Sequence, residues 1–136
     1  MDHPWRRLRT LTDWTLDWAL LPDGIDGITD WASRRIIMDR RLTQVQRRST
    51  LAHELEHIMR GPGGHWSQGH EEWEVEQGAA RRLVDIDELI DAARWTRWPD
   101  ELAEELWIDA DMLAALVDSL TAQERELVDR AVDGEG

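Results

Sequence analysis

The sequence predicts an α+β fold in which a small sheet precedes a series of helices. Two observations carry this prediction. Residues 14–39 hold three short segments separated by turn signals, the first a clear alternation of apolar and polar residues, as in half-buried strands. From Thr43 onwards, apolar residues recur at the three- and four-residue spacing of amphipathic helices. A chain of 136 residues suits one domain with a modest core.

The strand region opens with WTLDWALLP, in which Trp14, Leu16, Trp18 and Leu20 alternate with smaller or polar residues. Turn signals follow at residues 22–24 and 26–27, where Pro, Asp and Gly cluster. The segments GITDW and RRIIMD give two further strands, with a turn near residues 32–33 between them. We therefore expect a small antiparallel sheet of about three strands.

A helix is predicted from Gln44 to about Arg60. Thr43 and Gln46 have the spacing of a capping box at its start, and Gly61-Pro62 ends it. After a Gly-rich loop over residues 61–70, a second helix is expected to start near Glu71 and to run to about residue 95. Residues 99–132 read as three short helices, with breaks near Asp109 and at residues 120–121.

The charge and composition exclude several classes of partner and site. A net charge of −13 argues against direct binding of nucleic acid or an anionic membrane, and it is compatible with a basic protein partner or peptide. Without cysteine, any metal must be held by His, Asp or Glu. No apolar run reaches the ~18 residues of a membrane span, and the N-terminus lacks the apolar core of a signal peptide. A cytoplasmic location is the default expectation.

The most informative motif is HELEH at residues 53–57. On a helix, His53 and His57 are four residues apart and lie on one face, so both imidazoles can bind a single zinc ion. Glu54 points about 100° away and can reach a water molecule at that ion, which is the position of a general base. Solvated histidines on a polar helix face are the alternative interpretation.

A catalytic zinc site needs a third protein ligand. A metzincin arrangement would put a third histidine at position 63, which is Gly. The second helix offers Glu71, Glu72, Glu74 and Glu76, and Glu72 shares its stripe with core-type residues 75, 79 and 83, which favours Glu72 as the ligand. Glu76 is placed to accept a hydrogen bond from a ligating imidazole. An ordinary solvated acidic run at a helix start stays open as an alternative.

Two loop histidines are further candidates. His65 or His70 is placed to stabilise an oxyanion, and His70 is an alternative third ligand. Solvated loop histidines, with His70 capping the second helix, are the simpler interpretation.

The motif and the helix that follows it resemble the ImmA/IrrE family of metallopeptidases. The resemblance rests on TLAHELEH followed by EWEVEQGAARRL, and it extends over about residues 14–93. It implies a zincin-like metallopeptidase core over residues 1–98, with zinc bound by His53, His57 and Glu72 and with Glu54 as the general base. Residues 99–136 are then an acidic helical C-terminal extension packed on the same domain. Val75 and Glu76 depart from the residues that the family prefers there, and no Pro closes the second helix.

The resemblance implies a zinc-dependent peptidase that cleaves a partner protein, a helix-turn-helix transcriptional repressor encoded nearby. One alternative is a non-catalytic protein of the same fold that sequesters a repressor or toxin. Another is a DNA-binding regulator, since residues 102–116 have the apolar spacing of a helix-turn-helix. The twelve acidic residues between Pro99 and Gly136, against two arginines, disfavour DNA binding.

Overall fold

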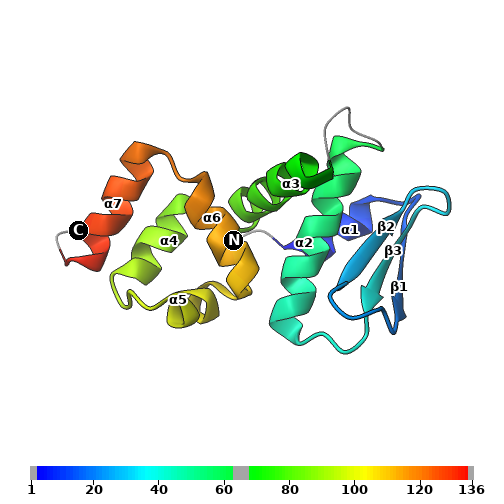
Figure 1. The fold of residues 1–136 in the computed structure, drawn as a ribbon, viewed down its shortest axis with the longest axis horizontal. Coiled ribbons are helices and arrows are strands. Elements are labelled where there is room, and N and C mark those ends of the chain that lie inside the picture. The colour runs from blue at the N-terminus through cyan, green and yellow to red at the C-terminus, as the bar shows by residue number, and fades with distance from the viewer. Residues whose placement is uncertain (1–2, 63–67, 135–136) are drawn as a thin grey trace.

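The computed structural model describes residues 3–62 and 68–134, and it describes only the backbone of residues 68–71. This part of the chain forms an α+β fold with seven helices and three strands. In chain order these are α1 (Pro4–Thr10), β1 (Thr15–Ala19), β2 (Gly27–Asp30), β3 (Arg35–Asp39), α2 (Gln44–Arg60), α3 (Gln68–Leu83), α4 (Ile86–Ala93), α5 (Pro99–Leu106), α6 (Ala110–Ser119) and α7 (Ala122–Val132). The sheet lies at one end of an elongated molecule, α4, α5 and α7 lie at the other, and α2 lies between them (Figure 1).

The sheet is mixed, so the predicted antiparallel sheet is wrong for one of its two strand pairs. The strand order is β1-β3-β2, with β2 antiparallel and β1 parallel to the central strand β3. Residues 20–26 connect the two edge strands β1 and β2, which leaves a gap between them. After the turn that follows Asp30, β3 fills this central position. An alternating pattern reports which residues share a face and carries no information on strand direction.

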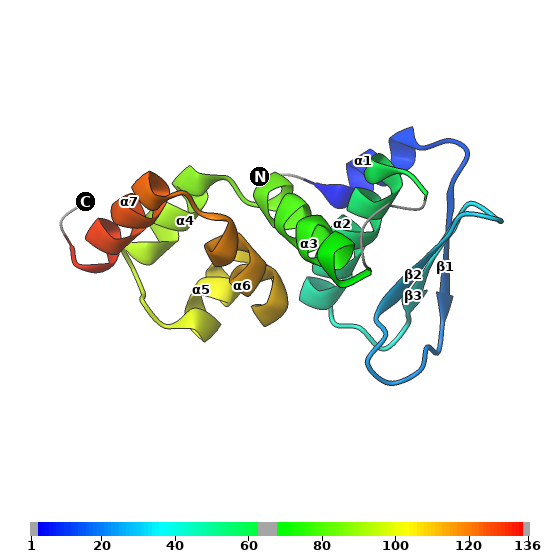
Figure 2. The same cartoon turned by 45° about the horizontal axis from the view of Figure 1, so that its top comes forward.

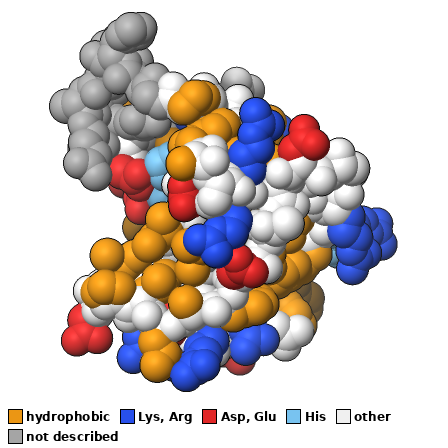
Figure 3. Space-filling model, turned by 90° about the vertical axis from the view of Figure 1, so that its right-hand side faces the viewer, with side chains coloured by type: hydrophobic (Ala, Val, Ile, Leu, Met, Phe, Trp, Pro, Cys, Tyr) orange, Lys and Arg blue, Asp and Glu red, His pale blue; other side chains and the backbone are white. Residues whose placement is uncertain are grey.

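One face of the sheet packs against α1 and α2. Ile36 and Met38 of β3 have no exposed surface and form a hydrophobic cluster with Leu42, Leu51 and Leu55. At the sheet end of the molecule, hydrophobic side chains also remain on the surface, with arginines among them (Figure 3). The exposed ones include Trp18, Leu20, Ile25 and Ile28.

Helix α2 has the predicted bounds and is the central element of the fold. Thr43 and Gln46 form the predicted capping box, and Gly61, with φ of +89°, ends the helix. Leu51 and Leu55 face the sheet, whereas Ala52 belongs to a second cluster built mainly from α3 to α7. Helix α3 runs alongside α2 in both views (Figures 1 and 2). Because apolar residues on different faces of α2 enter different clusters, its other faces are left for polar groups.

Two features of the helical part differ from expectation. The predicted second helix, from Glu71 to about residue 95, begins at Gln68 and is broken after Leu83, because Asp85 starts a new helix whose Glu88 accepts a hydrogen bond from the Asp85 amide. Helix α1 has no predicted counterpart, since it is short and lacks a capping side chain; its Trp5 and Leu8 pack on the sheet cluster. The three predicted C-terminal helices are confirmed as α5, α6 and α7.

Polar contacts fix the start of α6 beside α2. The buried Arg48 guanidinium donates to the carbonyl oxygens of Leu106 and Trp107 at 2.9 and 2.6 Å. Ser49 Oγ accepts the amide of Asp109 at 3.1 Å. The segment between α5 and α6 is therefore held against the same helix that carries HELEH. Among the described helices, none has the length and apolar character needed to cross a membrane.

Candidate metal centre

Two histidines of α2 and one glutamate of α3 meet where these helices run side by side. Nε2 of His53 lies 3.0 Å from one carboxylate oxygen of Glu72, and Nε2 of His57 lies 2.8 Å from the other. The two imidazole rings are 4.9 Å apart between centroids and inclined by 75°. The four-residue spacing puts both rings on one face of α2. The three side chains predicted as metal ligands are thus brought together.

The donor set fits a divalent metal ion. One donor atom from each of His53, His57 and Glu72 lies within 4.8 Å of the others. Tetrahedral coordination at about 2.0–2.1 Å separates donor atoms by about 3.4 Å. The present contacts of 2.8 and 3.0 Å need to open by only a few tenths of an ångström to reach that spacing. Side-chain exposures of 21%, 18% and 43% leave the group accessible from solvent.

Glu54 faces β2 from the neighbouring side of α2. Its side chain is buried, and the Thr29 hydroxyl donates a short hydrogen bond to its Oε2 atom. The backbone at Gly27 allows this approach, because a Cβ there would lie 2.8 Å from Thr50 Cγ2 and 3.1 Å from Glu54 Oε1. Strand β2 thus holds the Glu54 carboxylate through its Oε2 atom, and the Oε1 atom takes no part in the hydrogen bond to Thr29.

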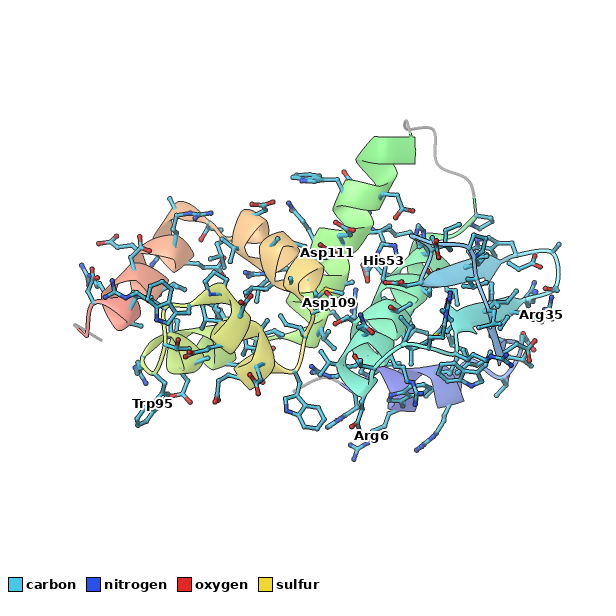
Figure 4. All side chains as sticks on the ribbon, turned by 60° about the horizontal axis from the view of Figure 1, so that its bottom comes forward. Arg6, Arg35, His53, Trp95, Asp109 and Asp111 are labelled. Carbon is cyan, nitrogen blue, oxygen red and sulfur yellow. The ribbon has the colours of Figure 1, made fainter. Side chains whose placement is uncertain are left out.

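A cleft of about 530 Å³ opens in front of His53, Glu54 and Glu72. Its other walls come from residues 24–27, from Ser49 and Thr50 of α2, from Glu76 of α3, and from Asp109, Asp111 and Met112 at the start of α6. Figure 4 shows Asp109 and Asp111 close to His53 in the middle of the molecule. His53 and Glu72 therefore stand at the edge of a cavity whose volume lies in the range of ligand-binding pockets.

The cleft is strongly acidic, and its acids influence one another. Burial raises the pKa of Asp109, and the negative charges of Asp111 and Asp26 raise it further, against the opposing hydrogen bond from the Met112 amide. Burial also raises the pKa of Glu76, where Asp111 and Glu72 add to the effect and His53 opposes it. For both groups burial is the largest cause, and the neighbouring carboxylates add to it.

The remaining predicted site residues have different outcomes. Glu76 lies on the cleft wall, but among the described residues no hydrogen bond joins it to His53 or His57, so its predicted role in fixing an imidazole has no contact to support it. His65 lies outside the described residues, and so does the side chain of His70, whose backbone lies in the first turn of α3. Their suggested roles stay predictions.

Sequence reasoning missed Thr29, Asp109 and Asp111. Thr29 lies on the same side of β2 as Gly27, and both approach Glu54 of α2. Nothing in the sequence of this strand marks that side, because the apolar Ile28 lies on the opposite, exposed side. In the sequence Asp109 indicates only a helix break, whereas in the structure its side chain caps α6 by accepting the Met112 amide at 2.8 Å. Nothing local in the sequence says that this helix start faces HELEH, because the contact depends on Arg48 and Ser49.

Among known proteins, no family profile, no curated protein and no solved structure matches this chain.

Proposed function

We propose that this chain is a zinc-dependent metallo-endopeptidase of the ImmA/IrrE type that cleaves a partner protein. In this proposal His53, His57 and Glu72 hold the zinc ion, and Glu54 is the general base. The observation that carries it is the convergence of the three donor groups within 4.8 Å, with Glu54 in the wall of the same cleft. Ion pairs between neighbouring helices also form without a metal, but here the histidines and the buried glutamate occur in the order that zinc hydrolases use.

The chain's own residues can perform the proton transfers of peptide hydrolysis. A bound zinc ion supplies a Lewis acid, which stabilises negative charge on the carbonyl oxygen and lowers the pKa of water. Glu54 takes one proton from the attacking water as its oxygen bonds to the carbonyl carbon. When the C–N bond breaks, Glu54 delivers that proton to the leaving amine and returns to its ionised state. The Thr29 hydroxyl holds the carboxylate in a fixed orientation throughout.

The partner that we propose is a helix-turn-helix repressor encoded nearby, met in the cytoplasm, with no direct contact to nucleic acid or membrane. This part rests on the resemblance and on the net charge of −13, which suits a basic protein. The alternative is a protein of the same fold that binds its partner without cutting it. The two functions differ at Glu54, because only hydrolysis needs a base there.

The test is an incubation of the zinc-loaded protein with the repressor encoded beside it, followed by mass spectrometry of the products. The wild-type protein is expected to cut the repressor. Glu54→Gln is expected to bind one zinc ion per chain and to leave the repressor intact. A repressor that binds but stays intact with the wild-type protein contradicts the enzyme and supports sequestration. Equal cleavage by Glu54→Gln contradicts the role of Glu54.

A further inference from the structure

We infer that the cleft selects a substrate segment with an Arg or Lys side chain next to the scissile bond, and that Asp109 and Asp111 select it. This inference rests on the proposed peptidase function and names its substrate class. It starts from the charges that surround the candidate metal ligands. Six carboxylates line the cleft: Asp26, Glu54, Glu72, Glu76, Asp109 and Asp111. No arginine lies among the lining residues in the described part of the chain.

A metal ion does not remove this excess of negative charge. A divalent cation offsets two unit charges, those of Glu72 and Glu54, while neutral imidazoles ligate through Nε2. The carboxylates of Asp26, Glu76, Asp109 and Asp111 then remain without a cationic partner in the lining. They come from three separate segments of the chain: the loop before β2, helix α3 and the start of α6. Their convergence leaves a place for positive charge that no described residue of the lining fills.

The helix dipole alone does not account for this arrangement. Acids in the first turn of a helix are favoured by the dipole, and Asp109 also caps α6. That explains Asp109 and Asp111 separately, but not why their helix start faces Glu76 and Asp26. The pKa of Asp109 is raised by burial and then by Asp111 and Asp26, so this carboxylate is held at an energetic cost that a nearby cation relieves.

The carboxylates also have free hydrogen-bonding capacity. Asp109 uses Oδ1 for the Met112 amide, which leaves Oδ2 available. Asp111 is exposed and has no hydrogen-bond partner among the described residues. A guanidinium or ammonium group donates several hydrogen bonds and makes short, charge-assisted contacts with carboxylates. A cleft of about 530 Å³ has room for one such side chain beside an extended peptide backbone.

The probe is a pair of quenched octapeptide pools, randomised with neutral residues around one central residue. That residue is Arg in one pool and citrulline, its neutral isostere, in the other. Zinc-loaded wild-type protein is expected to cleave the Arg pool with a kcat/KM at least about tenfold higher, a preference that weakens as salt is added. In Asp109→Asn/Asp111→Asn the preference is expected to fall below about threefold, with the fold kept because Asn also caps helices.

A matched control removes the same charge elsewhere. Asp100 and Asp129 are exposed and lie outside the cleft lining, so Asp100→Asn/Asp129→Asn is expected to keep the Arg preference of the wild type. An equal loss of preference in this control would mean that net charge, and not the cleft, selects the substrate. That result overturns the inference.

Binding separates this inference from the proposed function. Fluorescence anisotropy of both pools with zinc-loaded protein reports selection without hydrolysis. If nothing is cleaved but the Arg pool binds about tenfold more tightly through Asp109 and Asp111, the peptidase proposal fails and the selectivity holds. If both pools are cleaved and bound equally, the peptidase proposal holds and the inference is overturned.

Discussion

The HELEH motif of α2 contains two buried glutamates, Glu54 and Glu56, on opposite sides of the helix, and their surroundings differ. Glu56 lies between α2 and α3 with Oε2 3.3 Å from Arg82 Nε and Oε1 3.7 Å from Arg60 Nε. Glu54 lies between α2 and β2, where its described partner is the neutral hydroxyl of Thr29, and it lines an open cleft. Their exposures are nearly equal, at 4% and 5%, so burial does not distinguish them.

The difference is one of charge compensation. A buried carboxylate beside two guanidinium groups is satisfied by the protein and serves to join two helices. Glu54, in contrast, has no described cationic partner and lines a cavity beside two histidines. Its negative charge can therefore be neutralised by a cation that binds in that cavity. The Glu56 side of α2 is thus a structural interface, and the Glu54 side is the candidate site.

The largest expected effect comes from removing the charge of Glu54. Glu54→Gln is expected to lower kcat by about 10³-fold, since general-base catalysis contributes about 10²–10⁴-fold. The free energy of unfolding should change by less than about 1 kcal/mol, because Gln still accepts the Thr29 hydrogen bond. A cleavage assay with the partner protein measures kcat, and urea denaturation measures the free energy of unfolding. A large loss of stability with kcat unchanged would reverse the roles of the two glutamates.

Glu56→Gln is expected to give the opposite result. It leaves Arg60 and Arg82 without their shared carboxylate, and the guanidinium side chains are 35% and 43% exposed, which reduces the loss below that of a fully buried pair. We expect the free energy of unfolding to fall by about 1–3 kcal/mol. Zinc content and kcat of the folded protein should stay close to the wild type. Urea denaturation measures the change in stability, and the same cleavage assay measures kcat. If the stability of the variant is unchanged, Glu56 does not have the structural role described above.

Two glycines allow each side of α2 to be perturbed separately, because each one faces one of these glutamates. A Cβ at Gly78 would lie 2.5 Å from Glu56 Oε1 and 3.0 Å from Arg60 Nη2. Gly78→Ala is expected to destabilise the protein by about 1–2 kcal/mol, the strain exceeding the gain in helix propensity. Thermal unfolding checks this, with kcat expected to be unaffected.

A Cβ at Gly27 would instead press on Thr50 and Glu54. If Glu54 is the general base as proposed, Gly27→Ala is expected to lower kcat by about tenfold or more, because a small displacement of a reacting group is costly. Its effect on kcat should exceed that of Gly78→Ala. If the two alanine variants lose activity equally, their effects come from a general disturbance of packing, and the two sides of α2 do not differ in function.

The smallest expected effect concerns the ion pair between Arg81 of α3 and Glu124 of α7, which lies away from the candidate site. Hydrogen bonds from the Arg81 guanidinium lower the pKa of Glu124 from its ordinary value of 4.5 to about 2. Its contribution to stability is therefore present above about pH 4.5 and is lost as the pH falls towards 2. Glu124→Gln keeps the capping box with Thr121 and should flatten the pH dependence of unfolding in that window. An unchanged slope would mean that the pair does not join these helices in solution.

Local pattern predicted much of this fold. Spacing and caps gave α2 its bounds and divided the C-terminal segment into α5, α6 and α7. The parallel pairing of β1 with β3 was not predictable from alternation, and the break at Asp85 was hidden by apolar residues that continue the helical spacing. The proximity of His53, His57 and Glu72 was predictable because two adjacent helices carry them. Thr29 and Asp111 were not, since only the packing of distant segments brings them to the cleft.

We propose that His53, His57 and Glu72 together bind one metal ion. The most direct measurement is an anomalous difference map at the zinc absorption edge from crystals of the protein saturated with zinc. We expect one strong peak about 2.0–2.1 Å from Nε2 of both histidines and from a Glu72 oxygen. A map without a peak between these three groups, or with zinc held only by other side chains, would contradict it.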